Sequence, residues 1–438
     1  MKNSLPSFCY VVGLGVSGLS TAKWLKKNNL LLGVWDDSLQ KRQEAKNFGL
    51  PLLTPNKAFS HHHNQKPDAV ILSPGIPHAY PKPHKIANLA KSNNCEIIGD
   101  IELFFRAYPK AKIIGITGTN GKSTVTALLH KTLDYCDVSS FIGGNFGTPC
   151  FDLPEIKKFN PEKSWLIFEL SSFQIELSPS LKPQIMILLN IAPDHLDRYA
   201  SFSNYASVKW EVFKRLRPNS FSLIGPSTAY TPTFPLLSNT IHFTEKMLPF
   251  PLKDCPSLQG KHNKENATAV YLTAAHLKLP KDKIFQAFKT FTGLPHRQEK
   301  IISSENIKII NDSKATSFSA AAQAISNHSN IHWLVGGIAK NDDILQCSPY
   351  FDNLNHIYFF GRDGEFLKTT LKNKCRASVF NTLEDATLSA IKNMKKEPLP
   401  STLLLSPGCA SFDQFRNFEH RGDFFKNLIH SLQRNNEI

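Results

Sequence analysis

Near the N-terminus, a run of apolar residues leads into a glycine-rich turn and then into apolar positions at helical spacing. Residues 8–12 predict a buried strand, residues 13–18 (Gly-Leu-Gly-Val-Ser-Gly) a tight turn, and residues 19–25 the start of a helix with one buried face. A second apolar run, residues 31–35, predicts the next strand and ends at Asp36. This order is typical of a nucleotide-binding α/β unit, although such a turn also often serves only tight packing of strand against helix.

A second strand, loop and helix pattern follows further along the chain. Residues 112–117 predict a buried strand and residues 118–123 (Gly-Thr-Asn-Gly-Lys-Ser) a phosphate-binding loop, with apolar positions at helical spacing beyond it. The spacing departs from the strict P-loop pattern, because Gly115 stands six positions before Gly121. The chemistry is unchanged: backbone amides can surround a triphosphate, Lys122 can neutralise its outer oxygens, and the Ser123 hydroxyl can reach Mg²⁺.

Two further apolar runs predict strands of the same sheet, and each ends in polar residues. Glu169 closes the run 165–170, and Asp194 and His195 follow the run 185–191. The carboxyl ends of parallel strands share one edge of a sheet, where α/β proteins bind ligands. A carboxylate and an imidazole beside a phosphate loop suit Mg²⁺. Taken singly, Glu169 could cap a helix and His195 could be an ordinary loop histidine.

The last third of the chain repeats one design of apolar runs that lead into polar loops. The loops are rich in Gly, Ser, Lys, Thr and Arg, and they follow residues 307–310, 333–335, 357–360 and 403–405. In a parallel sheet with right-handed crossovers, all of these loops emerge at one edge. A cleft with such residues suits a small anionic substrate, for example a carboxylate.

The length of 438 residues and the proline-rich and turn-like segments between the apolar patterns predict several domains. Prolines between residues 74 and 83 separate the first pattern from the second, and a turn-like segment at 293–297 precedes the last. We predict an α/β fold of three domains. They are a Rossmann-like domain (1–98), a central P-loop ATPase-like domain (99–293) and a C-terminal Rossmann-like domain (294–438).

Composition excludes several classes of protein. No apolar run approaches the ~18 residues of a membrane span, and the eight cysteines contain no C-x-x-C pair, which indicates a reducing cytoplasm. Lysine and arginine outnumber acidic residues by 51 to 36, but they are spread along the chain, so we expect anionic small molecules and no nucleic acid. The run 61–63 of three histidines fits an exposed loop better than a metal site. Arg421-Gly422-Asp423 matches an adhesion tripeptide by chance, within a helical pattern.

Together these motifs resemble the Mur ligases, the ATP-dependent amide-forming enzymes of peptidoglycan precursor synthesis. The resemblance covers essentially the whole chain. Matching blocks in the order of the family are more specific than any one motif, and they lie at residues 115–124, 143–149, 169–174, 194–199, 260–267, 293–297, 311–316 and 406–415.

The resemblance implies ATP, two Mg²⁺ ions and three catalytic residues, namely Lys122, His195 and Lys209. Lys209 matches the family's carbamylated lysine. Carbamylation requires the neutral amine and CO₂, and it converts a cation with an ordinary pKa of about 10.4 into an anionic oxygen ligand. The implied metal ligands are Ser123, Glu169, His195 and Lys209. The implied ATP contacts are Gly118, Thr119, Asn120, Gly121, Lys122, Ser123, Thr124, Asn266, Arg297 and Asp312.

The resemblance also implies two substrate sites. In this family the glycine turn of the first domain holds the diphosphate of a UDP-linked muramoyl substrate, for which the implied contacts are Leu14, Val16, Asp36, Gly75, Asn145 and His195. The blocks 311–316 and 406–415 favour D-glutamate over a diamino acid as the acceptor in the last domain. The implied D-glutamate contacts are Lys314, Thr316, Lys340, Ser411 and Phe418.

The expected function is therefore an acid-amino-acid ligase that joins D-glutamate to UDP-N-acetylmuramoyl-L-alanine through an acyl phosphate. We expect it to act as a cytoplasmic monomer without membrane insertion. The chain departs from the usual family pattern at Ala192-Pro193, before Asp194, and at Ile338-Ala339, before Lys340.

Three alternatives stay open. An NAD-dependent oxidoreductase built on residues 13–18 would bind nicotinamide without requiring ATP, and it would leave residues 115–124 without a role. A P-loop regulator or nucleic-acid motor would bind polynucleotides with a steep dependence on salt. Another Mur ligase or a folate polyglutamate ligase would share the central module, but the latter lacks a domain like residues 1–98.

Overall fold

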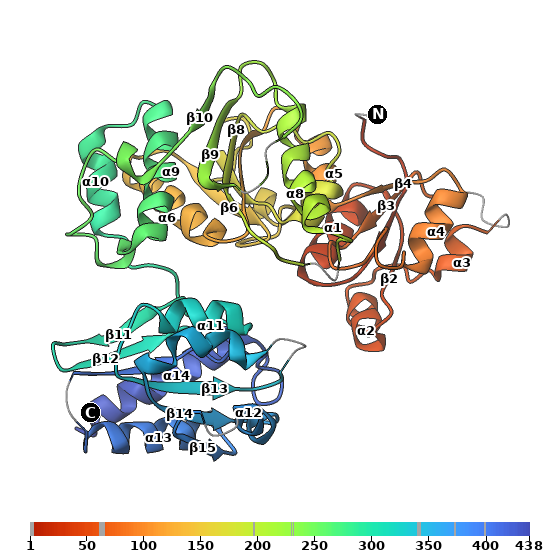
Figure 1. Cartoon of the computed structure of the whole chain (residues 1–438). Helices are drawn as coiled ribbons and strands as arrows, with labels where there is room; N and C mark the ends of the chain where they lie inside the picture. Colours follow the sequence, from red (N-terminus) through yellow and green to blue (C-terminus); the bar gives the residue numbers. More distant parts are fainter. Residues whose placement is uncertain are drawn as a thin grey trace. The chain divides into compact units, whose positions relative to one another are not determined.

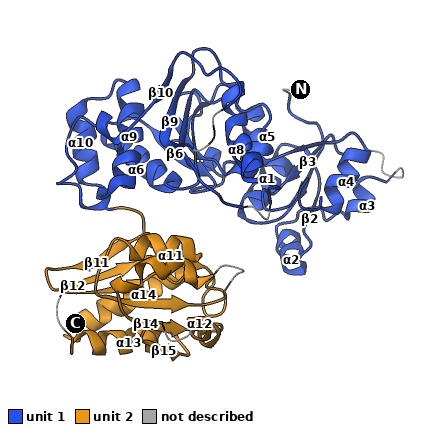
Figure 2. Cartoon of the chain, in the orientation of Figure 1, with its two compact units in different colours: residues 1–292 blue, residues 293–438 orange. Residues whose placement is uncertain are grey.

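The chain folds into two compact units, Met1–Thr292 and Gly293–Ile438 (Figure 2). The computed structural model describes residues 4–60, 66–195, 198–228, 230, 232–339, 343–371, 374–397 and 400–438. Both units consist of largely parallel sheets covered by helices, which confirms the predicted α/β class. The division of the first unit at residue 98 stays a prediction.

The first sheet of unit 1 belongs to its N-terminal part, and its strands are parallel. Its strand order is β2 (Leu31–Trp35), β1 (Cys9–Val12), β3 (Ala69–Leu72) and β4 (Glu96–Ile98). Strands β1 and β3 are buried throughout, as expected of strands covered on both faces. The helices of this part are α1 (Val16–Lys27), α2 (Leu39–Asn47), α3 (Pro55–Ala58), α4 (Lys85–Ser92) and α5 (Asp100–Ala107).

The second sheet of unit 1 carries the phosphate loop. Its order is β10 (Thr240–His242), β9 (Phe221–Thr228), β8 (Ile185–Ile191), β5 (Lys112–Thr117), β7 (Trp165–Glu169) and β6 (Ser140–Gly144). The helices are α6 (Lys122–Tyr135), α7 (Ser172–Glu176), α8 (Phe202–Glu211), α9 (Lys261–His276) and α10 (Lys281–Lys289). Short 3-10 helices are η1 (Leu153–Glu155), η2 (Phe213–Arg215), η3 (Glu245–Met247) and η4 (Pro256–Leu258).

Helices α6, α9 and α10 cover one face of this sheet (Figure 1). Buried residues of the opposite face share a hydrophobic core with residues of the N-terminal sheet. In that shared core, Phe104 of α5 packs against Phe168 of β7, with ring centroids 5.7 Å apart. The ring centroids of Trp24 of α1 and Phe151 are 4.5 Å apart. The Ser20 hydroxyl donates a hydrogen bond to Asp152. These contacts explain why residues 1–292 form one compact unit.

Unit 2 contains one sheet with the order β11 (Glu299–Ser303), β12 (Ile307–Asn311), β16 (Ser401–Leu405), β13 (Ile331–Gly336), β14 (Leu354–Phe360) and β15 (Ala377–Phe380). Strands β12, β16, β13 and β14 are parallel neighbours, so their polar loops share one edge. Strand β11 is antiparallel to β12 and was not among the predicted strands. The helices are α11 (Phe318–Ile325), η5 (Ile344–Asn353), α12 (Gly364–Thr370), α13 (Leu383–Met394) and α14 (Phe418–Arg434). None of the described helices is both long and apolar enough to cross a bilayer.

Candidate active site

The phosphate loop joins β5 to α6, and its shape depends on glycine. Gly118 and Gly121 have φ of +153° and +85°, a backbone region that side chains rarely adopt. A Cβ atom on Gly121 would also lie 2.5 Å from Oδ1 of Asn266 on α9. The structure therefore places Asn266, a predicted ATP contact, directly against the loop. The loop ends at the N-terminus of α6, where the helix dipole favours an anion.

Strand β8 fixes the loop from the neighbouring position in the sheet. The Asn120 amide donates to Asn190 Oδ1 at 2.8 Å, and Asn190 Nδ2 returns a bond to the Asn120 carbonyl at 3.1 Å. The Thr119 amide bonds the Asn190 carbonyl at 3.0 Å. Our prediction did not include Asn190 among the site residues, although its place at the carboxyl end of a predicted strand was a usable signal.

Lys122 and Lys209 both lie at this loop. Lys122 Nζ donates to the carbonyl oxygens of Gly118 and Thr119, at 2.8 and 2.9 Å. Lys209 on α8 is 2% exposed, and its Nζ donates to the same Gly118 carbonyl at 3.2 Å. Burial, followed by the charge of Lys122, lowers the pKa of Lys209 well below its ordinary value. A neutral amine is the form that carbamylation requires.

Glu169 presents an unpaired oxygen at the carboxyl end of β7. Asn145 binds this residue twice, because its backbone amide donates to the Glu169 carbonyl at 2.9 Å and its Nδ2 to Oε1 at 2.8 Å. Oε2 is buried without a hydrogen-bond partner among the described residues. A buried carboxylate oxygen without a donor is costly unless a cation is nearby. Glu169 therefore fits a Mg²⁺ ligand, together with the buried Ser123 at the start of α6.

His195 lies in the same region, on the loop after β8. Its ring packs on Phe173, with centroids 5.0 Å apart, and lies 6.3 Å from the ring of Tyr205. Tyr205 contacts Lys209 Nζ, which lies 4.8 Å from the ring centroid. His195 is half-exposed, and its Nε2 is 3.6 Å from Asp194 Oδ2. No group of three or more His, Cys, Asp or Glu side chains in the described parts of the chain could hold a metal by itself.

The N-terminal glycine turn is held by Asp36. Its two carboxylate oxygens accept the backbone amides of Leu14, at 2.7 Å, and Ser38, at 2.8 Å. The Leu14 side chain is buried, so this residue could contact a ligand only through its backbone. Val16, in contrast, is 75% exposed. The Gly75 carbonyl accepts a bond from Arg198 at 2.9 Å, which connects the N-terminal sheet to the His195 loop.

In unit 2, three of the residues predicted to contact D-glutamate, Lys314, Thr316 and Phe418, lie in the loop after β12 or at the start of α14. The Lys314 ammonium lies 5.0 Å from the ring centroid of Phe418, at the start of α14. Thr316 ends the same loop as Lys314, and Ser411 is buried in the loop after β16. Lys340 lies outside the described residues.

Asp312, a predicted ATP contact, precedes Lys314 in this loop. The Ser406 hydroxyl and the Gln298 amide donate to its carboxyl oxygens at 2.8 and 3.1 Å. Burial outweighs these bonds and the nearby charge of Arg297, and it raises the pKa of Asp312 to about 7.

This raised pKa predicts how Asp312→Asn changes the pH dependence of stability. Between pH 4 and 7, Asp312 keeps a proton in the folded protein that it loses in the unfolded chain. Its contribution to the free energy of unfolding therefore falls as pH rises. Relative to Asp312→Asn, the wild-type protein should lose on the order of 2–4 kcal/mol of stability across this range. Thermal unfolding of both proteins at several pH values measures the difference. A difference that is constant with pH would contradict the expectation.

Comparisons with known proteins identify the family of this chain. The family model described as "Mur ligase middle domain" matches residues 116–244, and "Mur ligase MurD-like, N-terminal domain" matches residues 7–99. The UDP-N-acetylmuramoylalanine--D-glutamate ligase of Paramagnetospirillum magneticum is 36% identical, over 96% of this chain and 96% of its own length. The protein of the same name from Rickettsia prowazekii is also 36% identical, over 95% of this chain and 96% of its own.

Solved structures share the fold at lower sequence identity. A UDP-N-acetylmuramate-alanine ligase from Thermotoga maritima superposes with a TM-score of 0.55 at 17% identity, covering 97% of this chain and 99% of that one. A pseudomurein peptide ligase type C from Methanothermus fervidus gives 0.54 at 17% identity, covering 97% and 100%. A MurF ligase from Thermotoga maritima in complex with ADP gives 0.51 at 14% identity, covering 84% and 90%. From the extent and identity of the matching relatives, this chain belongs to the Mur ligase family.

Proposed function

We propose that this protein is an ATP-dependent ligase that forms the amide bond between D-glutamate and UDP-N-acetylmuramoyl-L-alanine, in peptidoglycan precursor synthesis. The observation that carries the proposal is the convergence of Lys122, Lys209 and the Gly118 carbonyl at one phosphate loop. Full-length similarity to ligases named for this reaction supports the choice of substrates.

The proposed reaction has two steps. The carboxylate of the UDP-linked substrate attacks the γ-phosphorus of ATP, which forms an acyl phosphate and releases ADP. The neutral amine of D-glutamate then attacks the acyl carbon, and the C–O bond to phosphate breaks to leave the amide, phosphate and a proton. Negative charge develops on oxygen in both steps, and fixed cations in a site that excludes water stabilise it best. Lys122 and the amides at the start of α6 would provide this stabilisation at the phosphates.

We propose two Mg²⁺ sites. Ser123 and Glu169 would hold the first, because Glu169 Oε2 is buried and unpaired. His195 and a carbamylated Lys209 would hold the second. When bound, Mg²⁺ would neutralise phosphate charge and help to orient the transferred group. Asn145 would fix the Glu169 carboxylate through the bond at 2.8 Å.

The proposed substrate contacts lie in both units. The turn from Leu14 to Val16, with Asp36 and Gly75, would bind the UDP part. Lys314, Thr316, Lys340, Ser411 and Phe418 would surround D-glutamate, and Asn266, Arg297 and Asp312 would contact ATP. We propose that the enzyme acts in the cytoplasm as a monomer.

Phosphate release from ATP in the presence of UDP-N-acetylmuramoyl-L-alanine tests the proposal. The full-length protein is incubated with Mg²⁺ and with D-glutamate, L-glutamate, L-alanine or a diamino acid as the acceptor. We expect release with D-glutamate alone, together with a product whose mass corresponds to one added glutamate. Release with L-alanine or a diamino acid instead would assign the protein to another activity of the same family.

A further inference from the structure

Arg421 is a buried arginine in the first turns of α14, and its partners are loops at the carboxyl edge of the sheet in unit 2. Its side chain is 0% exposed. Nε donates to Ser313 Oγ at 2.9 Å, and one terminal nitrogen donates to the Ser313 carbonyl at 2.8 Å. The other terminal nitrogen donates to the carbonyls of Cys409, at 3.1 Å, and Gly336, at 3.4 Å. One side chain therefore joins the loops that follow β12, β13 and β16.

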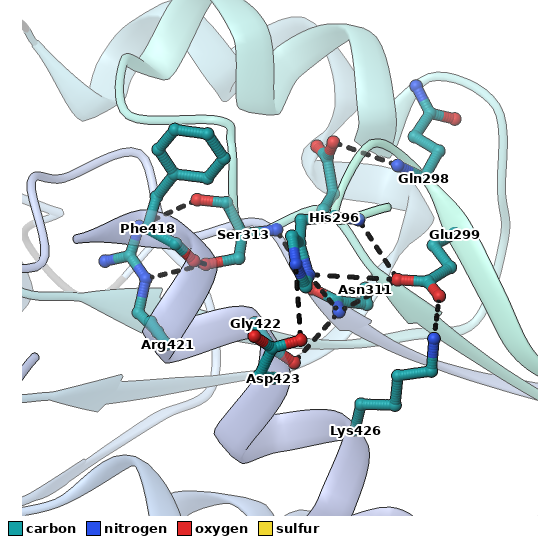
Figure 3. Close-up of polar contacts among 11 residues, drawn as sticks. His296, Gln298, Glu299, Asn311, Ser313, Phe418, Arg421, Gly422, Asp423 and Lys426 are labelled. Atoms are coloured by element: carbon teal, nitrogen blue, oxygen red, sulfur yellow. Dashed lines mark hydrogen bonds and ion pairs between the residues drawn. The ribbon is translucent and has the colours of Figure 1, made fainter. Parts of the chain in front are cut away.

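The first turns of α14 hold the loop after β12 at further points (Figure 3). The Ser313 hydroxyl donates to the Phe418 carbonyl at 2.8 Å, and Asn311 Nδ2 donates to the Gly422 carbonyl at 3.1 Å. Gly422 has no room for a side chain, because a Cβ atom would lie 2.2 Å from Nδ1 of His296. Arg421-Gly422 is thus a packing element of this edge, and its burial excludes a role as an exposed adhesion motif.

Residues proposed above to bind D-glutamate, the acceptor amino acid, lie on these same loops. Lys314 follows Ser313 directly, Ser411 lies two residues after Cys409, and Gly336 is the last residue of β13, from which the chain leads toward residue 340. Gly337 approaches closely as well, since a Cβ atom there would lie 3.4 Å from Arg421 and 2.1 Å from the Ala410 carbonyl. A shift of Arg421 would therefore displace at the same time the segments that carry the proposed D-glutamate contacts.

Among the described residues, no carboxylate is in direct contact with Arg421, and the charge of Asp413 acts on it only from a longer distance. Its four hydrogen bonds all end on neutral oxygens. Burial lowers the pKa of Arg421 to about 10, which still leaves it charged at neutral pH. Arg106 in unit 1 is also buried, but unlike Arg421 it forms ion pairs with Glu96 and Glu102. A buried cation that no carboxylate contacts directly produces a positive potential that favours nearby anions.

We propose that Arg421 is a positioning residue for the acceptor amino acid, which fixes the three loops and supplies a positive charge that favours an acceptor with two carboxylates. This inference rests on the proposed function and deepens it. Because Arg421 is fully buried, it acts through Ser313, Gly336 and Cys409 and does not touch the acceptor itself.

The test compares Arg421→Met and Arg421→Lys with the wild-type enzyme in the phosphate-release assay. Arg421→Met should raise the KM for D-glutamate on the order of tenfold to a hundredfold. The KM for the UDP-linked substrate should stay within about threefold, because its proposed contacts all lie in unit 1. Arg421→Lys keeps the charge but cannot form the same set of bonds, so it should recover part of the loss.

Arg434→Met, at the exposed end of the same helix, is the matched control and should leave every KM unchanged. Thermal unfolding shows which variants are folded. If Arg421→Met does not fold, Arg421→Lys and Ser313→Ala decide the question. Ser313→Ala removes the two hydrogen bonds of the Ser313 hydroxyl, with Arg421 and with the Phe418 carbonyl, and should raise the KM for D-glutamate several-fold.

Two results would overturn the inference: folded Arg421 variants with a wild-type KM for D-glutamate, or an equal rise in the KM of all three substrates. The proposed function fails by a different result, namely a wild-type protein that releases no phosphate with D-glutamate. The two failures are therefore distinguishable.

Discussion

Lys209→Ala is expected to lower ligase turnover on the order of 10²- to 10³-fold, and a short free carboxylate such as acetate should restore part of the activity. The reason is the position of this lysine. Its Nζ is buried against the Gly118 carbonyl, and burial lowers its pKa, so the amine is available to react with CO₂. Alanine leaves a space in which a small carboxylate could replace the carbamate.

Phosphate release with and without acetate measures both parts of this prediction. Lys214→Ala is a suitable control, because Lys214 is an exposed lysine shortly after α8 and contacts Glu211. Equal stimulation of the wild-type enzyme by acetate, or full activity of Lys209→Ala, would refute the carbamate role. Mass spectrometry of the wild-type protein in bicarbonate offers an independent test, in which one CO₂ adduct should be located on Lys209.

Lys122→Met is the second change with a large expected effect. Turnover should fall on the order of 10²- to 10³-fold, with a higher KM for ATP, because the variant loses the cation that lies over the phosphate loop. The Lys122 ammonium is held by the Gly118 and Thr119 carbonyls at the start of α6, where phosphate oxygens would bind.

The experiment is a titration of ATP in the same assay, with and without acetate. Acetate should not rescue Lys122→Met, which separates the role of a phosphate-binding cation from that of a modified lysine. Lys131→Met, further along α6, is the control and should behave as the wild type. A Lys122→Met enzyme with an unchanged KM for ATP and normal turnover would exclude this loop as the nucleotide site.

Local sequence was sufficient for the strands and loops that carry the site. The predicted strand 112–117 is β5, and 185–191 is β8, with the same bounds. Continuous apolar runs identify strands that are buried on both faces. Glycines mark backbone that other residues rarely adopt, as the positive φ of Gly118 and Gly121 shows.

Other features required the whole fold. Lys209 and Gly118 are 91 residues apart, and only the packing of α8 against the loop brings them to 3.2 Å. In the sequence, Lys209 alone reads as a surface lysine on an amphipathic helix. Arg421 looked like part of a chance tripeptide, yet it is buried and bonded to Ser313, 108 residues away. The antiparallel strand β11 was also missed, because its residues are only partly buried and show no continuous apolar run.

Hydrophobic patterns, glycine positions and short motifs are local properties of the chain, so they were sufficient for the α/β class, the phosphate loop and the family. Which distant side chains meet, which of them lose contact with water and which buried charges lack an ion pair could be established only from the folded chain. Those properties depend on the order of strands in a sheet and on the packing of helices over it, and burial is what shifts the pKa of Lys209, Asp312 and Arg421.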